Sequence, residues 1–197
     1  MTDFKVVIGV PVPMDYMADV RTIAYCSAEA TRLGVTWGYV ASRDAGVGRS
    51  TFAHIALQDP DVTHLYFMDY DVLPPNGALA TLLQHDVPIV AGVYRMTTSP
   101  PAWSFKMDDK WYGQGSPLPK GPTKVTCVAG STLLVKREVF EKVPNPPFKI
   151  EYRAIDEDGR CYDEGEDEYF SRVAQEAGYD LMIDPSVVCE HFKKGAI

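Results

Sequence analysis

The chain has 197 residues and a formal net charge of −8, with 46% hydrophobic and 23% charged residues. This length suffices for one substantial core but is short for two full domains, and the composition is that of an ordinary globular protein. The negative charge argues against a nucleic-acid polymer as the main partner. The first apolar run, Val6 to Val10, is too short to span a bilayer and lacks the basic lead-in of a signal peptide. We therefore predict a cytoplasmic protein without a membrane span.

The cysteines indicate no metal or disulfide framework. Their positions show neither a CxxC pair nor the rhythm of zinc ligands. We expect reduced, mostly buried thiols, as is usual in a reducing compartment. The residues concerned are Cys26, Cys127, Cys161 and Cys189.

The first half of the chain alternates between predicted strands and helices. Runs of β-branched and apolar residues favour strands, and apolar positions at helical spacing favour helices. The predicted strands are 5–10, 35–40, 62–68 and 88–93, and the predicted helices are 15–33, 47–57 and 76–84. Such alternation is typical of right-handed βαβ units that build a parallel sheet.

The second half is less regular. Residues 94–123 are rich in proline, glycine and aromatic residues, which predicts a long functional loop or short irregular strands. A strand is expected over 132–135, a helical turn over 137–142 and an irregular segment over 144–165. The last helix is predicted over 166–177, before Gly178, and strands at 181–183 and 187–189 complete the sheet.

The most informative segment is the apolar run Leu65 to Met68 followed by Asp69, Tyr70 and Asp71. Side chains alternate along an extended segment, so Asp69 and Asp71 are expected to point the same way. Two carboxylates at the end of a buried strand repel each other and resist losing water, and Mg²⁺ or Mn²⁺ relieves both problems. The alternative is that both residues merely begin the turn that two prolines continue.

Two further groups of polar residues occur later in the chain. Glu164 to Glu168 holds four acids around Gly165 at the start of the last predicted helix, more than helix capping alone explains. His191 ends the last predicted strand and is followed by Lys193 and Lys194. The lysines suit a phosphate or an ordinary solvated tail, and a lone histidine is more often structural than functional.

The order of these motifs resembles that of the GT-A glycosyltransferases, most closely the small inverting enzymes of the family 2 type. The matching stretches are Asp69 to Asp71, Ala129 to Arg137, Gly165 to Phe170, Ala177-Gly178, Asp184-Pro185 and His191. The resemblance implies a Rossmann-like, three-layer α/β fold with a mainly parallel central sheet and helices on both faces. It also implies one GT-A domain over 1–197, with a nucleotide-binding half at about 1–93 and an acceptor and catalytic half at about 94–197.

The resemblance also implies roles for single residues on the nucleotide and metal side. Pro11, Val12 and Pro13 match the loop that holds the nucleotide base, and Arg43 lies in a region that contacts the nucleotide. Asp71 matches the carboxylate that binds Mn²⁺ or Mg²⁺, and Asp69 the one nearer the ribose or the metal waters. His191 resembles the histidine that closes the metal site.

On the acceptor side, Asp167 matches the general base and Glu166 an acceptor contact, while Lys193 would help to stabilise the departing pyrophosphate. The implied function is metal-dependent transfer of a sugar from a nucleotide-diphosphate sugar, UDP- or GDP-linked, to an acceptor hydroxyl with inversion. The small size suggests that the acceptor is bound by loops 94–123 and 144–165, or by a second subunit of a homo-oligomer.

Two alternatives remain open. One is a nucleotide-sugar binding module that has lost catalysis. The other is a sugar nucleotidyltransferase, which normally needs a glycine-rich, basic loop after the first strand. The loop here, Pro11-Val12-Pro13-Met14-Asp15, contains neither glycine nor a basic residue, which disfavours that chemistry.

Overall fold

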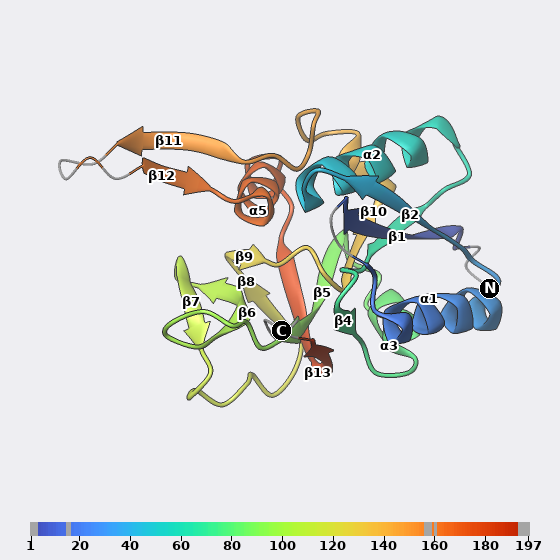
Figure 1. Cartoon of the computed structure of the whole chain (residues 1–197), viewed down its shortest axis with the longest axis horizontal. Coiled ribbons are helices and arrows are strands. Elements are labelled where there is room, and N and C mark those ends of the chain that lie inside the picture. Colours follow the sequence, from blue (N-terminus) through green and yellow to red (C-terminus); the bar gives the residue numbers. More distant parts are fainter. Residues whose placement is uncertain (1–3, 15–16, 156–158, 160, 193–197) are drawn as a thin grey trace.

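The structure is a computed structural model that describes residues 4–14, 17–155, 159 and 161–192. Its centre is an eight-stranded sheet with the order β2-β1-β3-β10-β5-β13-β4, in which β8 also pairs with β13 (Figure 1). The strands are β1 (Val6–Pro13), β2 (Thr36–Ser42), β3 (His64–Phe67), β4 (Val72–Leu73), β5 (Ile89–Tyr94), β8 (Thr123–Val125), β10 (Leu133–Lys136) and β13 (Leu181–His191).

The sheet is mostly parallel, as expected. Strands β2, β1, β3, β5 and β13 run in one direction. Strand β10 lies antiparallel between β3 and β5, and β4 and β8 run antiparallel to β13. Because β10 separates β3 from β5, the βαβ series does not continue across the whole sheet.

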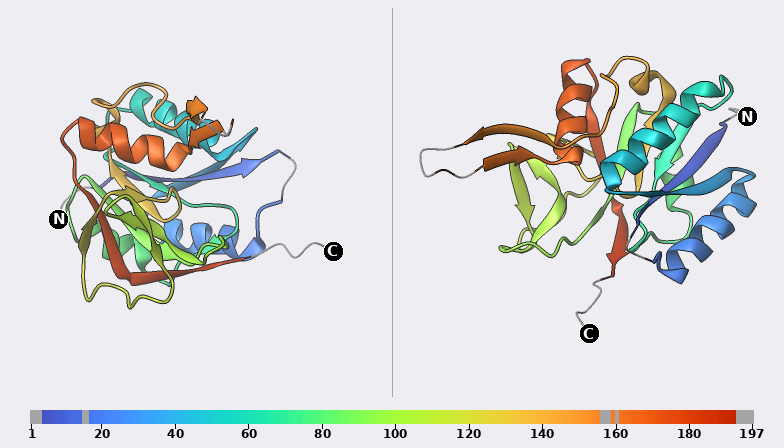
Figure 2. Two further views of the ribbon diagram at one scale, coloured as in Figure 1. Left: turned by 90° about the vertical axis from the view of Figure 1, so that its left-hand side faces the viewer. Right: turned by 45° about the horizontal axis from the view of Figure 1, so that its top comes forward.

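Helices cover both faces of this sheet, which gives the predicted three layers (Figure 2). The helices are α1 (Val20–Leu33), α2 (Ala45–Gln58), α3 (Ala78–Leu83), α4 (Arg137–Phe140) and α5 (Glu166–Glu176). Helices α2, α4 and α5 contribute to one apolar core, and α1 and α3 to the other. Side chains point to alternate faces along each strand, so one strand contributes to both cores: Leu65 and Phe67 lie in the first and Tyr66 in the second.

Smaller sheets lie outside the central one. Strands β6 (Ala102–Met107), β7 (Lys110–Gly113) and β9 (Cys127–Val128) form a three-stranded sheet. Strands β6 and β7 come from residues 94–123, which were expected to form a loop or short strands, and β9 follows that segment. Strands β11 (Glu151–Ile155) and β12 (Cys161–Glu164) form a hairpin that projects from the body (Figure 1). The irregular segment predicted over 144–165 is therefore wrong for the two strands of this hairpin. Their sequences are polar and lack the alternation of apolar residues by which a strand is recognised.

Two boundaries also differ from expectation. Helix α1 begins at Val20 instead of residue 15, because Asp19 has extended backbone and its carboxylate accepts a hydrogen bond from the Arg21 N–H. The two predicted final strands form one strand, β13, whose register shifts between Ile183 and Val188 around Pro185. Of the cysteines whose side chains are described, Cys26, Cys127 and Cys189 are free and buried, as predicted.

Candidate functional site

The acidic motifs meet around one buried cation, Arg49 of α2. Its side chain is 2% exposed. Nη2 lies 2.5 Å from Oδ1 of Asp69, and Nη1 lies 3.1 Å from Oε1 of Glu166 and 3.2 Å from Oδ1 of Asp167. One guanidinium thus joins the turn after β3 to the first turn of α5.

Asp69 and Asp71 lie in the turn between β3 and β4, not in the strand itself. Strand β3 ends at Phe67, and the turn is closed by a hydrogen bond from the Val72 N–H to the Asp69 carbonyl, at 3.3 Å. The Asp69 N–H donates to Oγ of Ser131 at 3.0 Å. The extended geometry predicted for the pair is therefore wrong, yet the turn places both carboxylates at the site.

Gly130, just before β10, makes room for the charged cluster. A Cβ atom at this position would press against the guanidinium of Arg49 and the carboxylate of Asp167. Gly46 has a related role, since a Cβ atom there would lie 3.0 Å from Cβ of Glu166. These glycines let α2, α5 and the segment before β10 approach closely enough for the ion pairs to form.

Burial and charge shift the protonation of two of these acids. Burial raises the pKa of Asp69, and Arg49 opposes that shift. Burial also raises the pKa of Asp167 to about 7, against the opposing effect of Arg49, and the Glu166 and Asp69 carboxylates raise it further. Burial among like charges therefore makes Asp167 hold its proton more tightly than an exposed aspartate does.

Asp71 faces His191 at the end of β13. Nε2 of His191 lies 3.6 Å from Oδ2 of Asp71, and Nδ1 lies 3.3 Å from the Arg95 carbonyl. The Phe192 N–H donates to the Asp71 carbonyl at 2.8 Å, which fixes the strand end against the turn. The neighbouring Asp71 carboxylate raises the pKa of His191.

This pair suits a divalent cation by its donor types. With Nδ1–H donating to the Arg95 carbonyl, Nε2 presents its lone pair beside the Asp71 carboxylate. Adjacent donors about 2.1 Å from one ion are about 3.0–3.4 Å apart, close to the separation of these two atoms. Within the described residues, no group of three or more His, Cys, Asp or Glu side chains is arranged to hold a metal. A cation held by Asp71 and His191 would thus take its other ligands from water or phosphate oxygens.

The residues predicted to hold the nucleotide are only partly brought to this site. Pro11, Val12 and Pro13 end β1 and pair with the last residues of β2. Arg43 directly follows β2, but its side chain is 86% exposed and pairs with Asp44 at 3.5 Å instead of joining the ion pairs around Arg49. Lys193 lies outside the described residues.

Arg49 is the residue that the sequence interpretation missed. It precedes Phe52, Ala53 and Ala56 by three, four and seven positions, so it lies on the buried stripe of α2. A charge on such a stripe signals a buried partner, because an unpaired charge is too costly to bury. The position of Arg49 on the buried stripe thus predicts a buried acidic partner, but the sequence does not identify which acid it is.

Comparison with known proteins finds structures of similar fold but no matching sequence family. Neither a protein-family model nor a curated protein sequence matches the chain. Among solved structures, A197 from STIV is similar with a TM-score of 0.70 at 19% identity, over 97% of this chain and 87% of that one. GalNAc-T7, solved with UDP, GalNAc and Mn²⁺, is similar with a TM-score of 0.58 at 12% identity, over 96% of this chain and 44% of that one.

At these identities the likeness concerns the fold. The chain has a GT-A-like α/β fold and spans less than half the length of GalNAc-T7. No helix within the described part of the chain combines the length and apolar character needed to cross a membrane.

Proposed function

We propose that the chain is a glycosyltransferase that moves a sugar from a nucleotide-diphosphate sugar to an acceptor hydroxyl, with inversion and with a bound divalent cation. The observation that carries the proposal is the convergence of Asp69, Glu166 and Asp167 on Arg49, beside the pair formed by Asp71 and His191. These groups lie where β3 ends, and ligands of open α/β sheets bind at such strand ends. GalNAc-T7, which shares the fold, was solved with UDP and Mn²⁺.

Asp167 is the proposed general base. Its carboxylate takes the proton of the acceptor hydroxyl as the acceptor oxygen forms a bond to the anomeric carbon of the donor. The bond from that carbon to the phosphate oxygen breaks, and its electron pair leaves with the nucleoside diphosphate. A pKa of about 7 lets Asp167 accept a proton at neutral pH, and such assistance typically gives about 10²–10⁴-fold in rate. Glu166, beside it on the first turn of α5, would bind the acceptor.

Asp71 and His191 are the proposed ligands of Mn²⁺ or Mg²⁺, and Asp69 is proposed to lie nearer the ribose or the waters of the ion. When bound, the cation would neutralise the charge that develops on the pyrophosphate. Pro11 to Pro13 and Arg43 would border the nucleotide, UDP or GDP, at the ends of β1 and β2. Arg49 holds the neighbouring carboxylates in place and favours their ionised form, because its charge opposes the effect of their burial on the pKa.

The test is donor hydrolysis and sugar transfer with UDP- and GDP-sugars in the presence of Mn²⁺. Asp71→Asn and Asp167→Asn should each lower the rate at least about 10²-fold. Asp61→Asn is the matched control, since Asp61 is an exposed aspartate that pairs with Lys5 far from the site. Tight, metal-dependent binding of UDP or GDP without turnover on any acceptor would instead identify a binding module. Full activity in both site variants would refute the assignment.

A further inference from the structure

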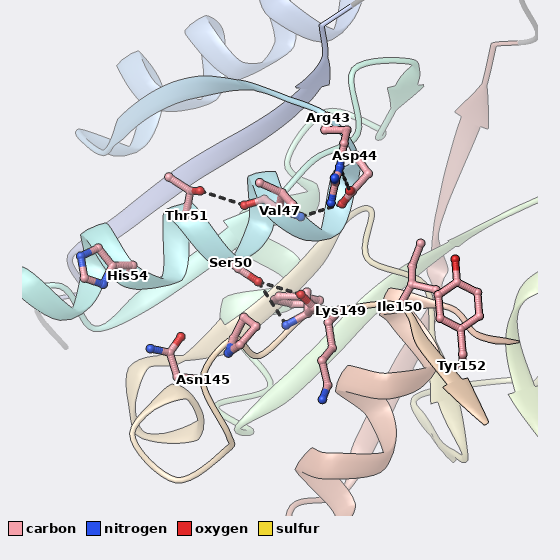
Figure 3. A pocket seen from close by; sticks show the side chains of 12 residues that line it. Arg43, Asp44, Val47, Ser50, Thr51, His54, Asn145, Lys149, Ile150 and Tyr152 are labelled. Carbon is pink, nitrogen blue, oxygen red and sulfur yellow. Dashed lines mark hydrogen bonds and ion pairs between the residues drawn. The ribbon is translucent and has the colours of Figure 1, made fainter.

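A cavity of about 740 Å³ lies beside the acidic cluster, between α2 and residues 145–152. Figure 3 shows side chains of α2 along one side and those of the 145–152 segment along the other. The volume falls within the range of about 300–1,000 Å³ that is usual for small-molecule sites. None of the site residues above except Arg43 lines it.

Hydrogen bonds join the two sides of this cavity, which we call the groove, and one side lies close to the acidic cluster. Oγ of Ser50 donates to the Phe148 carbonyl at 2.9 Å and accepts from the Phe148 N–H at 3.2 Å. The Phe148 ring packs on Phe170 at a centroid distance of 4.5 Å and lies 5.9 Å from Cζ of Arg49. These contacts hold the two sides of the groove together, and the Phe148 ring lies beside the cation that holds Asp69 and Asp167.

One end of the groove reaches the acceptor side of the proposed site. Asp44 and Val47 line it there, and Gly46 between them is in close approach to Glu166. A ligand that extends along the groove would thus end beside the first turn of α5.

The charges that line the groove are already paired. Arg43 pairs with Asp44 at 3.5 Å, and Lys149 pairs with Glu151 at 3.0 Å. Within the groove, a phosphate or carboxylate ligand would have to compete with Asp44 and Glu151 for these two cations, which favours a neutral ligand there. Arg43 lies at the end of the groove and would also border the proposed nucleotide site.

The remaining lining combines flat or apolar surface with polar hydrogen-bonding groups. Tyr152, Ile150 and Val47 are 76%, 46% and 43% exposed, an unusual grouping of large apolar side chains at one place on the surface. Thr51, His54 and Asn145 supply a hydroxyl, an imidazole and an amide beside them. This mixture suits a sugar ring, which has apolar C–H faces and a rim of hydroxyl groups.

We propose that the groove between α2 and residues 145–152 binds a neutral carbohydrate chain and presents its end to Glu166 and Asp167. This rests on the proposed function, because it names the acceptor class for the same site. The groove itself would hold the carbohydrate without donor or metal.

The experiment measures binding to the full chain by amide NMR, with no nucleotide or metal present. Cellotriose, maltotriose and chitotriose are the neutral probes, and trigalacturonate is an anionic probe of the same length. At least one neutral trisaccharide should shift the resonances of residues 43–54 and 145–152, and trigalacturonate should bind about tenfold more weakly than that trisaccharide. Shifts for no neutral probe, or tighter binding of trigalacturonate, would overturn the proposal.

Three variants locate the site on the groove. His54→Trp fills it and Tyr152→Ala removes its aromatic face, and each should weaken trisaccharide binding about tenfold. Ile55→Trp is the matched control, because Ile55 is the next residue of α2, is 51% exposed and lies outside the lining. Thermal unfolding verifies that all three variants fold. Unchanged binding in both groove variants would also overturn the proposal.

Donor hydrolysis by the wild-type chain, measured in parallel, separates this inference from the proposed function. A chain that hydrolyses a nucleotide sugar but binds no trisaccharide refutes the groove alone. A chain that binds the trisaccharide in the groove but acts on no donor refutes the transferase proposal and supports the groove.

Discussion

Arg49 and Asp69 are 20 residues apart in the chain, and Nη2 of the first lies 2.5 Å from Oδ1 of the second. The same guanidinium contacts Glu166 and Asp167 from the far end of the sequence. Asp69 is therefore engaged by a protein cation, whereas Asp71 faces His191. The two aspartates of one turn thus have different partners and are expected to respond differently to substitution.

Removal of the buried cation should destabilise the fold. Arg49→Met leaves three carboxylates around a buried position without their counter-charge, and breaking a buried ion pair costs about 3–5 kcal/mol. Urea unfolding at neutral pH measures the loss. Arg43→Met, at an exposed position just before α2, should change the free energy of unfolding by less than about 0.5 kcal/mol. Equal stability of the two variants would contradict the role given to Arg49.

Asp71 should matter more for metal binding than Asp69. Oδ1 of Asp69 is already bound to Arg49, whereas Asp71 and His191 present an oxygen and a nitrogen to the same point. In Mn²⁺ titrations with UDP present, Asp71→Asn and His191→Ala should each weaken binding about tenfold or more. Asp69→Asn should have the smaller effect on Mn²⁺ affinity. The reverse order would show that Asp69 is the principal ligand.

The rate of transfer should rise with pH through the neutral range. Burial raises the pKa of Asp167 to about 7, and a general base works only in its deprotonated form. Below pH 6, kcat/KM should therefore fall about tenfold per pH unit, with an ascending limb centred near 7. Asp167→Asn should abolish this limb in a profile measured at saturating Mn²⁺. A flat profile in the wild type would exclude Asp167 as the base.

The raised pKa of Asp167 should also make the stability of the fold depend on pH, and stability should fall with rising pH where the rate of transfer rises. The folded-state pKa of Asp167 lies above that of an unfolded aspartate, about 3.9, so the folded state binds the proton more tightly. The contribution of this carboxyl to the free energy of unfolding should fall as pH rises from 4 to 7. Comparison of wild type and Asp167→Asn by urea unfolding across this range measures it, and a difference that does not vary with pH would contradict the shift.

Gly130 should not tolerate a side chain. A methyl group there would press against Arg49 and Asp167, and overpacking of this kind typically costs about 1–3 kcal/mol. Gly130→Ala should lower both the melting temperature and the rate of transfer. Gly121→Ala is the control, because a Cβ atom at Gly121 meets no atom within 4 Å. Similar melting temperatures for the two variants would show that the segment before β10 can shift to accommodate the added methyl group.

Much of the fold can be predicted from local sequence patterns. The strands predicted over 62–68 and 88–93 and the helices predicted over 47–57 and 166–177 correspond to β3, β5, α2 and α5. They could be predicted because apolar runs and helical spacing depend on neighbours a few residues away. The β11–β12 hairpin and the antiparallel insertion of β10 did not follow, because strand pairing depends on segments far apart in the chain.

For the site, the sequence by itself identified the acids and the late histidine as unusual residues at the ends of predicted strands and at the start of a helix. The packing of the folded chain was needed to show that Arg49 holds three of those acids together, that Asp71 and His191 face each other, and that Arg43 is exposed and pairs with Asp44. The physical reason is that residue type and period report how a side chain is buried. Which charge lies beside it is set by the packing of different elements, here between 20 and 118 residues apart for the partners of Arg49.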